Sequence, residues 1–199
     1  MCDDVIAEWR KTEAVGHPAL FAVKERQLRE QVTALVRGEA REPPSPGCRP
    51  AQFEREFGPL PVRVPDGEDV WLKGQVDRVD VGDGRAVVLD YKIGSKKTYS
   101  AQVGEDTLCV TAWQLPIYAA AVRRELGISD VDARFYSLRD GEPTKAVREP
   151  PHFAASLGTV RQAMLAGDFT VRPREDACER CSMESACRVR QLKIAEDEP

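Results

Sequence analysis

The 199-residue sequence has no run of about 18 apolar residues, the length a helix needs to cross a bilayer. We therefore expect no transmembrane helix and no membrane partner. A secretory signal is also missing, because the first ten residues are acidic and lack an apolar core. These two absences favour a cytoplasmic protein.

An excess of basic residues is absent too. Lys and Arg number 29 against 33 Asp and Glu, for a net charge of −4. Domains that bind nucleic acid usually carry a basic excess, so the overall charge does not indicate one, although a local patch is enough. Local clusters occur at Lys92, Lys96 and Lys97 and again at Arg123 and Arg124. A solvated face is the alternative interpretation of such clusters.

Hydrophobic residues make up 42% of the chain and charged residues 31%, as in an ordinary globular protein. The length suits one domain with a small appendage. Two β-prone runs carry the most information: GQVDR at residues 74–78 and VLDYK at 88–92. Ionised groups inside strands are costly unless they are paired or bind a metal, so Asp77, Asp90 and Lys92 require an explanation.

A hairpin closed at the Gly-Asp-Gly turn between the runs places Asp77 directly opposite Asp90. The same register places Gln75 opposite Lys92, and period-2 alternation puts Asp90 and Lys92 on one face. Two adjacent carboxylates repel each other unless a proton or cation lies between them. Mg²⁺ prefers such oxygen ligands, and a nearby lysine can stabilise phosphoryl charge. The pattern therefore predicts metal-assisted phosphodiester hydrolysis.

The alternative is a surface hairpin with ordinary salt bridges, and a register slip by one residue would move Asp77 to the other face.

The chain holds six cysteines, and three of them form the pattern Cys-x-x-Cys-x₅-Cys at Cys178, Cys181 and Cys187. Close spacing in a reducing compartment indicates a structural metal site, and thiolates select zinc or an iron–sulfur cluster. Both usually take four protein ligands, so Cys2 and Cys48 are candidates for the fourth. Cys109 lies in an apolar run and is expected to be buried.

Hydrophobic periodicity predicts a short mixed sheet with helices on both sides, an α/β domain. The expected helices are 3–13, 18–39, 105–126 and 153–167, with Pro116 near a break in the third. The expected strands are 53–64, 70–81, 86–93 and 131–138, after a Pro-rich linker at 39–50. Three parts follow: an N-terminal helical segment and linker at 1–50, a core at 51–170 and a cysteine-rich tail at 171–199.

The runs GQVDR, LDYKIG (89–94) and QLPIY (114–118), in this order and spacing, resemble the PD-(D/E)XK nucleases. The RecB-like and AddB-like nuclease domains and the CRISPR-associated nucleases of similar layout are the most similar branches. The cysteine tail resembles the cluster-binding end of AddB-like members. The resemblance implies a restriction-endonuclease-like core that uses Mg²⁺ or Mn²⁺.

The resemblance also implies roles for single residues. Asp77 and Asp90 would bind the metal, and Lys92 would be the catalytic lysine. The remaining implied site residues are Gln114 and Tyr118 facing the DNA strand, Glu54 as the upstream glutamate, and Cys178, Cys181 and Cys187 holding a 4Fe-4S cluster. Relatives with a cluster carry an upstream Cys-Pro-aromatic motif and some use a helix histidine, which this chain lacks; its His17 precedes a proline.

The expected function is a Mg²⁺- or Mn²⁺-dependent deoxyribonuclease, an exonuclease, that serves a helicase–nuclease machine in DNA repair or recombination. Its partners would be DNA and a helicase subunit or domain. The alternatives are a catalytically inactive DNA-binding scaffold of the same fold, a CRISPR-associated exonuclease, and a zinc-binding interaction domain.

Overall fold

The computed structural model of the chain describes residues 2–12, 16–170, 178, 181, 183, 186 and 187. The chain divides into two compact units, residues 1–158 and 159–199, and each is described by itself. The borders at residues 50 and 170 that the sequence suggests stay predictions.

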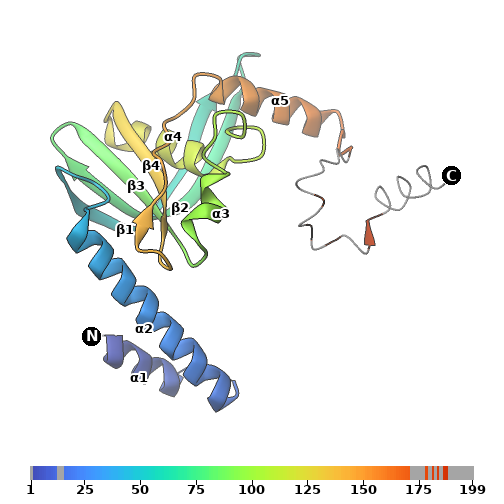
Figure 1. Ribbon diagram of the computed structural model, residues 1–199. Helices are drawn as coiled ribbons and strands as arrows, with labels where there is room; N and C mark the ends of the chain where they lie inside the picture. Colours follow the sequence, from blue (N-terminus) through green and yellow to red (C-terminus); the bar gives the residue numbers. More distant parts are fainter. Residues whose placement is uncertain are drawn as a thin grey trace. The chain divides into compact units, whose positions relative to one another are not determined.

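The first unit is built on a five-stranded mixed sheet in the order β1-β2-β3-β4-β5 (Figure 1). The strands are β1 (Cys48–Arg63), β2 (Asp69–Gly82), β3 (Arg85–Lys92), β4 (Asp130–Ser137) and β5 (Glu142–Pro143). Neighbouring strands are antiparallel except β3 and β4, which are parallel. Parallel strands need a crossover connection, and here it carries a helix.

The helices are α1 (Cys2–Thr12), α2 (Pro18–Arg41), α3 (Lys96–Ser100), α4 (Gln114–Leu126) and α5 (Phe153–Leu165). Helix α4 packs its buried small residues against one face of the sheet, where Ala119 and Ala121 share a core cluster with Val88, Ala133 and Phe135. The end of α2 reaches the sheet through contacts with β5. The α/β architecture with a mixed sheet flanked by helices confirms the predicted fold class. None of the helices in the described part of the chain combines the length and apolarity that crossing a bilayer requires.

The prediction of one helix over 105–126 was wrong in its first half. Helix α4 begins at Gln114, and the preceding residues form turns in which Cys109 has a positive φ of 59°. Pro116 therefore lies in the first helical turn, where a backbone N–H has no intrahelical partner and proline costs little. The predicted stop was right, because Gly127 ends the helix in the left-handed conformation with φ 64°.

The predicted linker at 39–50 is shorter in the structure. Helix α2 continues to Arg41, and β1 already begins at Cys48. The strand tolerates Pro50, Pro59 and Pro61 because β1 lies at the edge of the sheet, where a missing N–H breaks no inner ladder. The pairing of β1 with β2 also shifts register next to two of these prolines.

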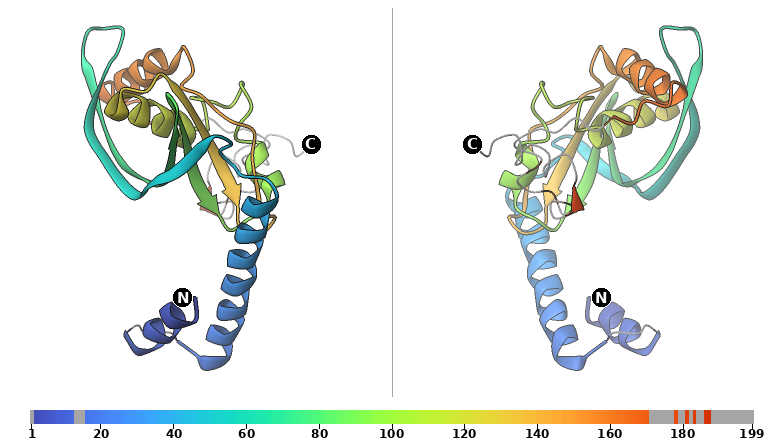
Figure 2. Two further views of the ribbon diagram at one scale, coloured as in Figure 1. Left: turned by 90° about the vertical axis from the view of Figure 1, so that its left-hand side faces the viewer. Right: turned by 90° about the vertical axis from the view of Figure 1, so that its right-hand side faces the viewer.

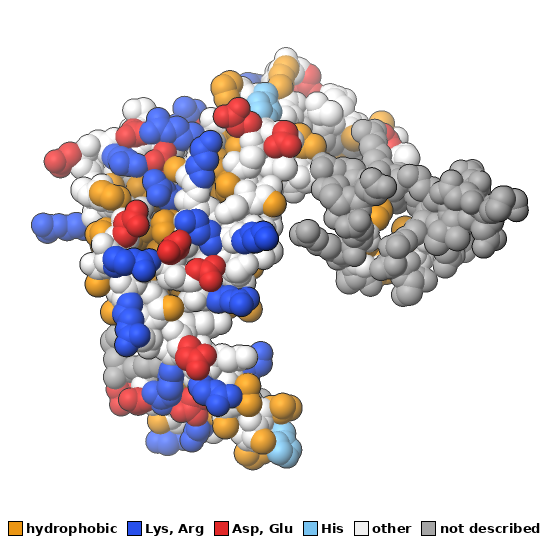
Figure 3. Space-filling view, in the orientation of Figure 1, with side chains coloured by type: hydrophobic (Ala, Val, Ile, Leu, Met, Phe, Trp, Pro, Cys, Tyr) orange, Lys and Arg blue, Asp and Glu red, His pale blue; other side chains and the backbone are white. Residues whose placement is uncertain are grey.

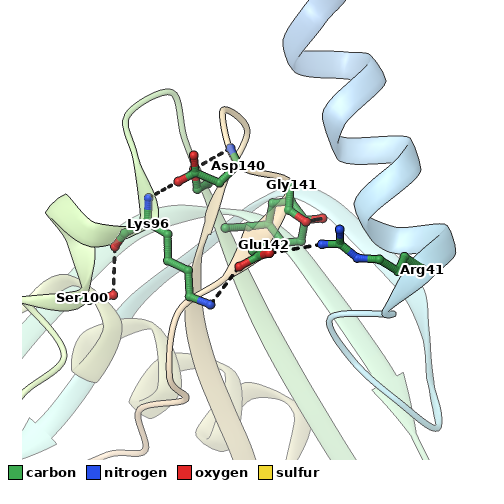
Figure 4. A network of polar contacts seen from close by, with 8 residues as sticks. Arg41, Lys96, Ser100, Asp140, Gly141 and Glu142 are labelled. Atoms are coloured by element: carbon green, nitrogen blue, oxygen red, sulfur yellow. Dashed lines mark hydrogen bonds and ion pairs between the residues drawn. The ribbon is translucent and has the colours of Figure 1, made fainter.

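Helix α2 docks on the sheet by its C-terminal end. A Cβ atom on Gly38 would collide with the carbonyl oxygen of Gly141 and the hydroxyl of Tyr136, so the two backbones approach too closely for a side chain. Close by, the Glu142 carboxylate binds both Arg41 of α2 (3.2 Å) and Lys96 of α3 (3.1 Å), as Figure 4 shows. These contacts connect α2, α3 and β5.

The other end of α2 carries α1, which folds back beside it (Figures 1 and 2). Trp9 packs edge-on against Phe21 with ring centroids 6.4 Å apart, and Arg10 bonds to Glu25. The two helices thus form a hairpin held by its own contacts.

Candidate active site

Strands β2 and β3 pair in the predicted register. Five pairs join residues 78–82 to residues 85–89, from Arg78↔Leu89 to Gly82↔Arg85, and Gly84 supplies the positive φ of the turn. The ladder ends there, one pair before Asp77 and Asp90. The register is the predicted one, and the next pair in it is Asp77–Asp90. The direct opposition of Asp77 to Asp90 and of Gln75 to Lys92 stays a prediction.

A side-chain contact continues where the ladder ends. The Tyr91 N–H of β3 donates a hydrogen bond of 2.8 Å to the Asp77 carboxylate of β2. This bond directs the Asp77 carboxylate toward the strand that carries Asp90 and Lys92. Burial is the main cause that raises the pKa of Asp90, and electrostatic repulsion from Asp77 adds to it.

Four side chains from β3 and α4 form a connected group. The Lys92 ammonium lies 2.5 Å from Asp90 Oδ2 and donates a 3.1 Å hydrogen bond to the Gln114 amide oxygen. The Gln114 amide nitrogen donates to Asp90 Oδ1 at 2.7 Å and contacts the Tyr118 hydroxyl at 3.0 Å. Gln114 and Tyr118 are thus adjacent on one helix face, as their spacing predicts.

Lys92 also contacts the aromatic ring of Phe135. Its ammonium nitrogen lies 5.1 Å from the centroid of the Phe135 ring on β4, within the range of a cation–π contact. Phe135 is the register partner of Asp90 in the parallel β3–β4 ladder. The buried ring supports the lysine while its side chain stays about a quarter exposed, at 24%.

Asp90 is the most deeply buried of the candidate catalytic groups, with 3% of its surface exposed. Burial raises the pKa of its carboxyl, and Lys92 only partly offsets this effect. Oδ2 forms the ion pair with Lys92 but accepts no hydrogen bond. The Lys92 ammonium is thus the one partner of this buried oxygen among the described residues, which leaves room in its coordination for a metal cation.

Glu54 lies on the same line across the sheet, because the β1–β2 register on either side places it opposite Asp77. Its backbone has a positive φ of 48°, an uncommon conformation for a residue other than glycine. Gln75 donates from its amide to the carbonyl and the carboxylate of Glu54, both at 3.1 Å. Gln75 thus belongs with Glu54 rather than with Lys92.

The comparisons with known proteins agree with this geometry. A family model for the PD-(D/E)XK nuclease superfamily matches residues 2–188. The chain belongs to the PD-(D/E)XK nuclease superfamily. Members of this superfamily are nucleases and generally use divalent metals. A comparison with curated proteins found no match.

Among solved structures, this PD-(D/E)XK protein is similar to one described as "Crystal structure of SSO0001". The two chains are 13% identical with a TM-score of 0.42, and the match covers 95% of this chain and 82% of the other.

The donor set of this PD-(D/E)XK protein fits a hard divalent cation. Asp77 and Asp90 supply two carboxylates, and the Asp90 Oδ2 atom accepts no hydrogen bond. Within the described residues, no group of three or more His, Cys, Asp or Glu side chains is arranged to hold a metal ion. Two carboxylates are what Mg²⁺ usually takes from a protein, since water and substrate phosphate complete its shell.

The three tail cysteines, Cys178, Cys181 and Cys187, are free thiols, and the Cys181 N–H bonds to the Cys178 carbonyl at 3.2 Å. They do not form a metal-holding group in the described part of the chain. Of the candidate fourth ligands, Cys48 starts β1 and is half-buried, and the Cys2 side chain lies outside the described residues. The iron–sulfur cluster therefore stays a prediction.

Two residues of the site escaped the sequence reasoning. Phe135 carried no local signal beyond its alternating strand, because its place under Lys92 depends on the β3–β4 register. Tyr91 was noted only as part of a motif, yet its backbone N–H connects the two acidic strands. Cys109, in contrast, is buried as predicted, with 4% exposure.

Proposed function

We propose that the protein is a Mg²⁺- or Mn²⁺-dependent deoxyribonuclease that hydrolyses phosphodiester bonds. One observation carries the proposal: Asp90, Lys92 and Gln114 meet within hydrogen-bond or ion-pair distance, with Asp77 directed toward them by Tyr91. Acid and amine groups clustered in this way, with one buried carboxylate oxygen engaged by the lysine alone, suit a cation and a phosphate better than a structural salt bridge.

When bound, a divalent cation would supply an activated water and offset charge on the phosphate oxygens. Asp77 and Asp90 would hold it from two strands. Lys92 is placed to stabilise the negative charge that develops on the phosphoryl group. Gln114 fixes the positions of both Asp90 and Lys92, and Tyr118 in turn holds the Gln114 amide.

DNA is the proposed substrate because the superfamily match identifies a nuclease and the surface offers basic side chains. Lys and Arg residues are spread over the sheet-bearing part of the face in Figure 3, with acidic residues among them. Such a mixed surface favours contacts to a phosphate backbone at selected points over tight general binding. Exonuclease action, a role in DNA repair or recombination, and a helicase partner are further parts of the proposal.

The test is a cleavage assay on end-labelled single- and double-stranded DNA with Mg²⁺, Mn²⁺ or EDTA. The unmodified protein should cleave with either metal and not with EDTA, and Asp90→Ala and Lys92→Ala should abolish cleavage. Lys145→Ala, which alters an exposed lysine outside the site, is the control and should cleave normally. Unchanged cleavage by Lys92→Ala would defeat the role proposed for that residue.

The alternative is a catalytically silent DNA-binding scaffold of the same fold. It predicts metal-independent DNA binding with no cleavage, and the same assay read beside a gel-shift measurement distinguishes the two. A CRISPR-associated exonuclease is the other alternative. It would also cleave from an end, so release of the end label tests exonuclease action for both proposals.

The iron–sulfur cluster is a separate proposal that rests on the spacing of Cys178, Cys181 and Cys187. An anaerobically purified protein that is brown and contains iron supports it. A colourless protein loaded with zinc supports the zinc-binding alternative for the same thiols.

A further inference from the structure

We propose that Glu39 of α2 is a positioning residue that acts through Arg78 and Tyr91 to fix the Asp77 carboxylate, so that α2 sets the affinity of the site for its divalent metal. The inference rests on the proposed function, because it concerns the same metal site. It goes beyond that function by giving a helix outside the catalytic motifs a part in building the site.

A buried arginine, Arg78, lies behind the site. Arg78 follows Asp77 in β2, is 6% exposed, and lies on the opposite face of the strand. Its guanidinium grips Asp80 with two bonds of 2.5 and 2.8 Å, and its remaining nitrogen donates to Glu39 at 2.6 Å and to the Tyr91 hydroxyl at 3.0 Å. All three nitrogens are therefore engaged, which holds the guanidinium in one place.

Tyr91 connects this arginine to the proposed metal ligand Asp77. Tyr91 is bonded twice: its hydroxyl accepts from Arg78, and its backbone N–H donates to the Asp77 carboxylate at 2.8 Å. Its ring also packs against Tyr136 at 6.0 Å between centroids. A displacement of the Tyr91 side chain would therefore shift the backbone donor that directs Asp77.

The backbone ladder between β2 and β3 ends before it reaches the motif residues. Regular pairing of β2 with β3 stops at Arg78↔Leu89, so it does not reach Asp77, Asp90 or Tyr91. Beyond that point the Arg78–Tyr91 and Asp77–Tyr91 hydrogen bonds connect the two strands. These side-chain bonds replace the ladder in setting how far apart the two acidic residues lie.

The docked end of α2 places Glu39 beside Arg78. Glu39 comes from an element distant in sequence, and the close approach at Gly38 and the ion pair between Arg41 and Glu142 hold this end of α2 on the sheet. The Glu39 carboxylate is thus presented to Arg78 from a fixed helix end. Partners one step removed from a metal ligand commonly control ligand orientation and metal affinity.

The experiment compares three substitutions with a control in the full chain. Glu39→Ala removes the carboxylate, Tyr91→Phe removes only the hydroxyl, and Glu39→Gln keeps an acceptor oxygen for Arg78. Asp132→Asn is the matched control, because Asp132 is a buried acid bonded to Arg85 near the far end of β3.

Two readouts are taken for each protein. Hydrogen exchange at the Tyr91 amide, followed by NMR relative to core amides, reports on its bond to Asp77. Mn²⁺ titration followed by electron paramagnetic resonance gives the metal dissociation constant. In Glu39→Ala and Tyr91→Phe we expect the backbone amide of residue 91 to exchange faster. The Mn²⁺ dissociation constant should rise roughly tenfold in both. In Glu39→Gln the exchange rate and the dissociation constant should stay close to those of the unmodified protein. Asp132→Asn should change neither quantity.

Tyr91 exchange that stays as slow as in the unmodified protein in both Glu39→Ala and Tyr91→Phe would overturn the positioning link. Faster exchange with an unchanged Mn²⁺ dissociation constant would overturn the claim that α2 sets metal affinity. An unmodified protein that neither binds Mn²⁺ nor cleaves DNA would refute the proposed function, and the same result removes metal affinity from the inference. The exchange measurement then still decides whether Glu39 positions Asp77.

Discussion

The two faces of the sheet differ most where β2 and β3 carry the motif residues. On the face toward α4, Asp90 has a buried oxygen that accepts no hydrogen bond, and its charge is offset by a single lysine. On the opposite face, Arg78 has every side-chain nitrogen bonded. Asp90 of β3 and Arg78 of β2, on opposite faces of the sheet, thus differ in how completely their polar atoms are bonded.

This difference indicates a division of tasks. A fully bonded group has one favoured position and can hold a strand in place. A partly bonded carboxylate retains capacity for a ligand, at a cost in stability that the rest of the fold offsets. The face of the sheet that carries Arg78 therefore holds the strands in position, and the face that carries Asp90 is left to bind a ligand.

The largest expected effect comes from breaking the satisfied face. Arg78→Met would leave Asp80, which is 1% exposed, as a buried carboxylate without its cation. We expect the free energy of unfolding to fall by about 3–5 kcal/mol, the usual cost of removing one partner of a buried pair. Urea denaturation followed by circular dichroism measures it.

Arg55→Met is the control for this substitution, because Arg55 pairs with Glu125 at a more exposed position. It should cost about 1 kcal/mol or less. Equal losses for the two arginines would mean that the bonds around Arg78 contribute no more than a surface pair, which contradicts the comparison.

The next effect comes from the unsatisfied face, and here stability and activity should separate. Asp90→Asn should slow DNA cleavage by about 10²–10³-fold, since a ligand of the proposed metal is lost. Its free energy of unfolding should stay the same or rise, because burial already disfavours the charge and raises the pKa of Asp90. Single-turnover cleavage and urea denaturation of one preparation test both parts. A large loss of stability with normal cleavage would reverse the assignment of the two faces.

The sequence predicted the front of the site better than the back. Alternation and the Gly-Asp-Gly turn were enough for the β2–β3 register, and a spacing of four placed Gln114 beside Tyr118. Both are short-range patterns, in which the local period decides the geometry.

The back of the site could not be predicted in this way. The bond between Glu39 and Arg78 joins residues 39 positions apart and depends on where α2 docks. The start of α4 was misplaced for a related reason, because the apolar residues at 108 and 109 enter the core from turns and imitate a helical stripe. Tertiary packing, which no local period records, decided both cases.

A smaller effect is expected where α2 meets the sheet. Alanine favours a helix over glycine by about 1 kcal/mol, so Gly38→Ala should stabilise a free helix. Here the added methyl would collide with Gly141 and Tyr136, and such overpacking costs about 1–3 kcal/mol. We therefore expect a net loss of stability in urea, with faster exchange at the Tyr91 amide. Val36→Ala, at an exposed site of the same helix, should be neutral or slightly stabilising. A stabilised Gly38→Ala protein would show that α2 does not need its close approach.

The smallest effect lies on the back face and is a change in how stability depends on pH in acid. Burial alone would raise the pKa of Asp132, but hydrogen bonds from Arg85 and Arg148 hold it below its usual value. The folded protein thus binds this proton less readily than the unfolded chain, so the stabilisation is complete above the unfolded pKa and is lost as pH falls through the folded one. Between about pH 5 and pH 3, the free energy of unfolding should fall less steeply in Asp132→Asn than in the unmodified protein. At pH 7 the substitution should cost only about 1 kcal/mol, because water can replace the lost partner of the half-exposed arginines. Parallel acid slopes for the two proteins would mean that Asp132 titrates alike in both states, and that even the well-bonded face is looser than its contacts indicate.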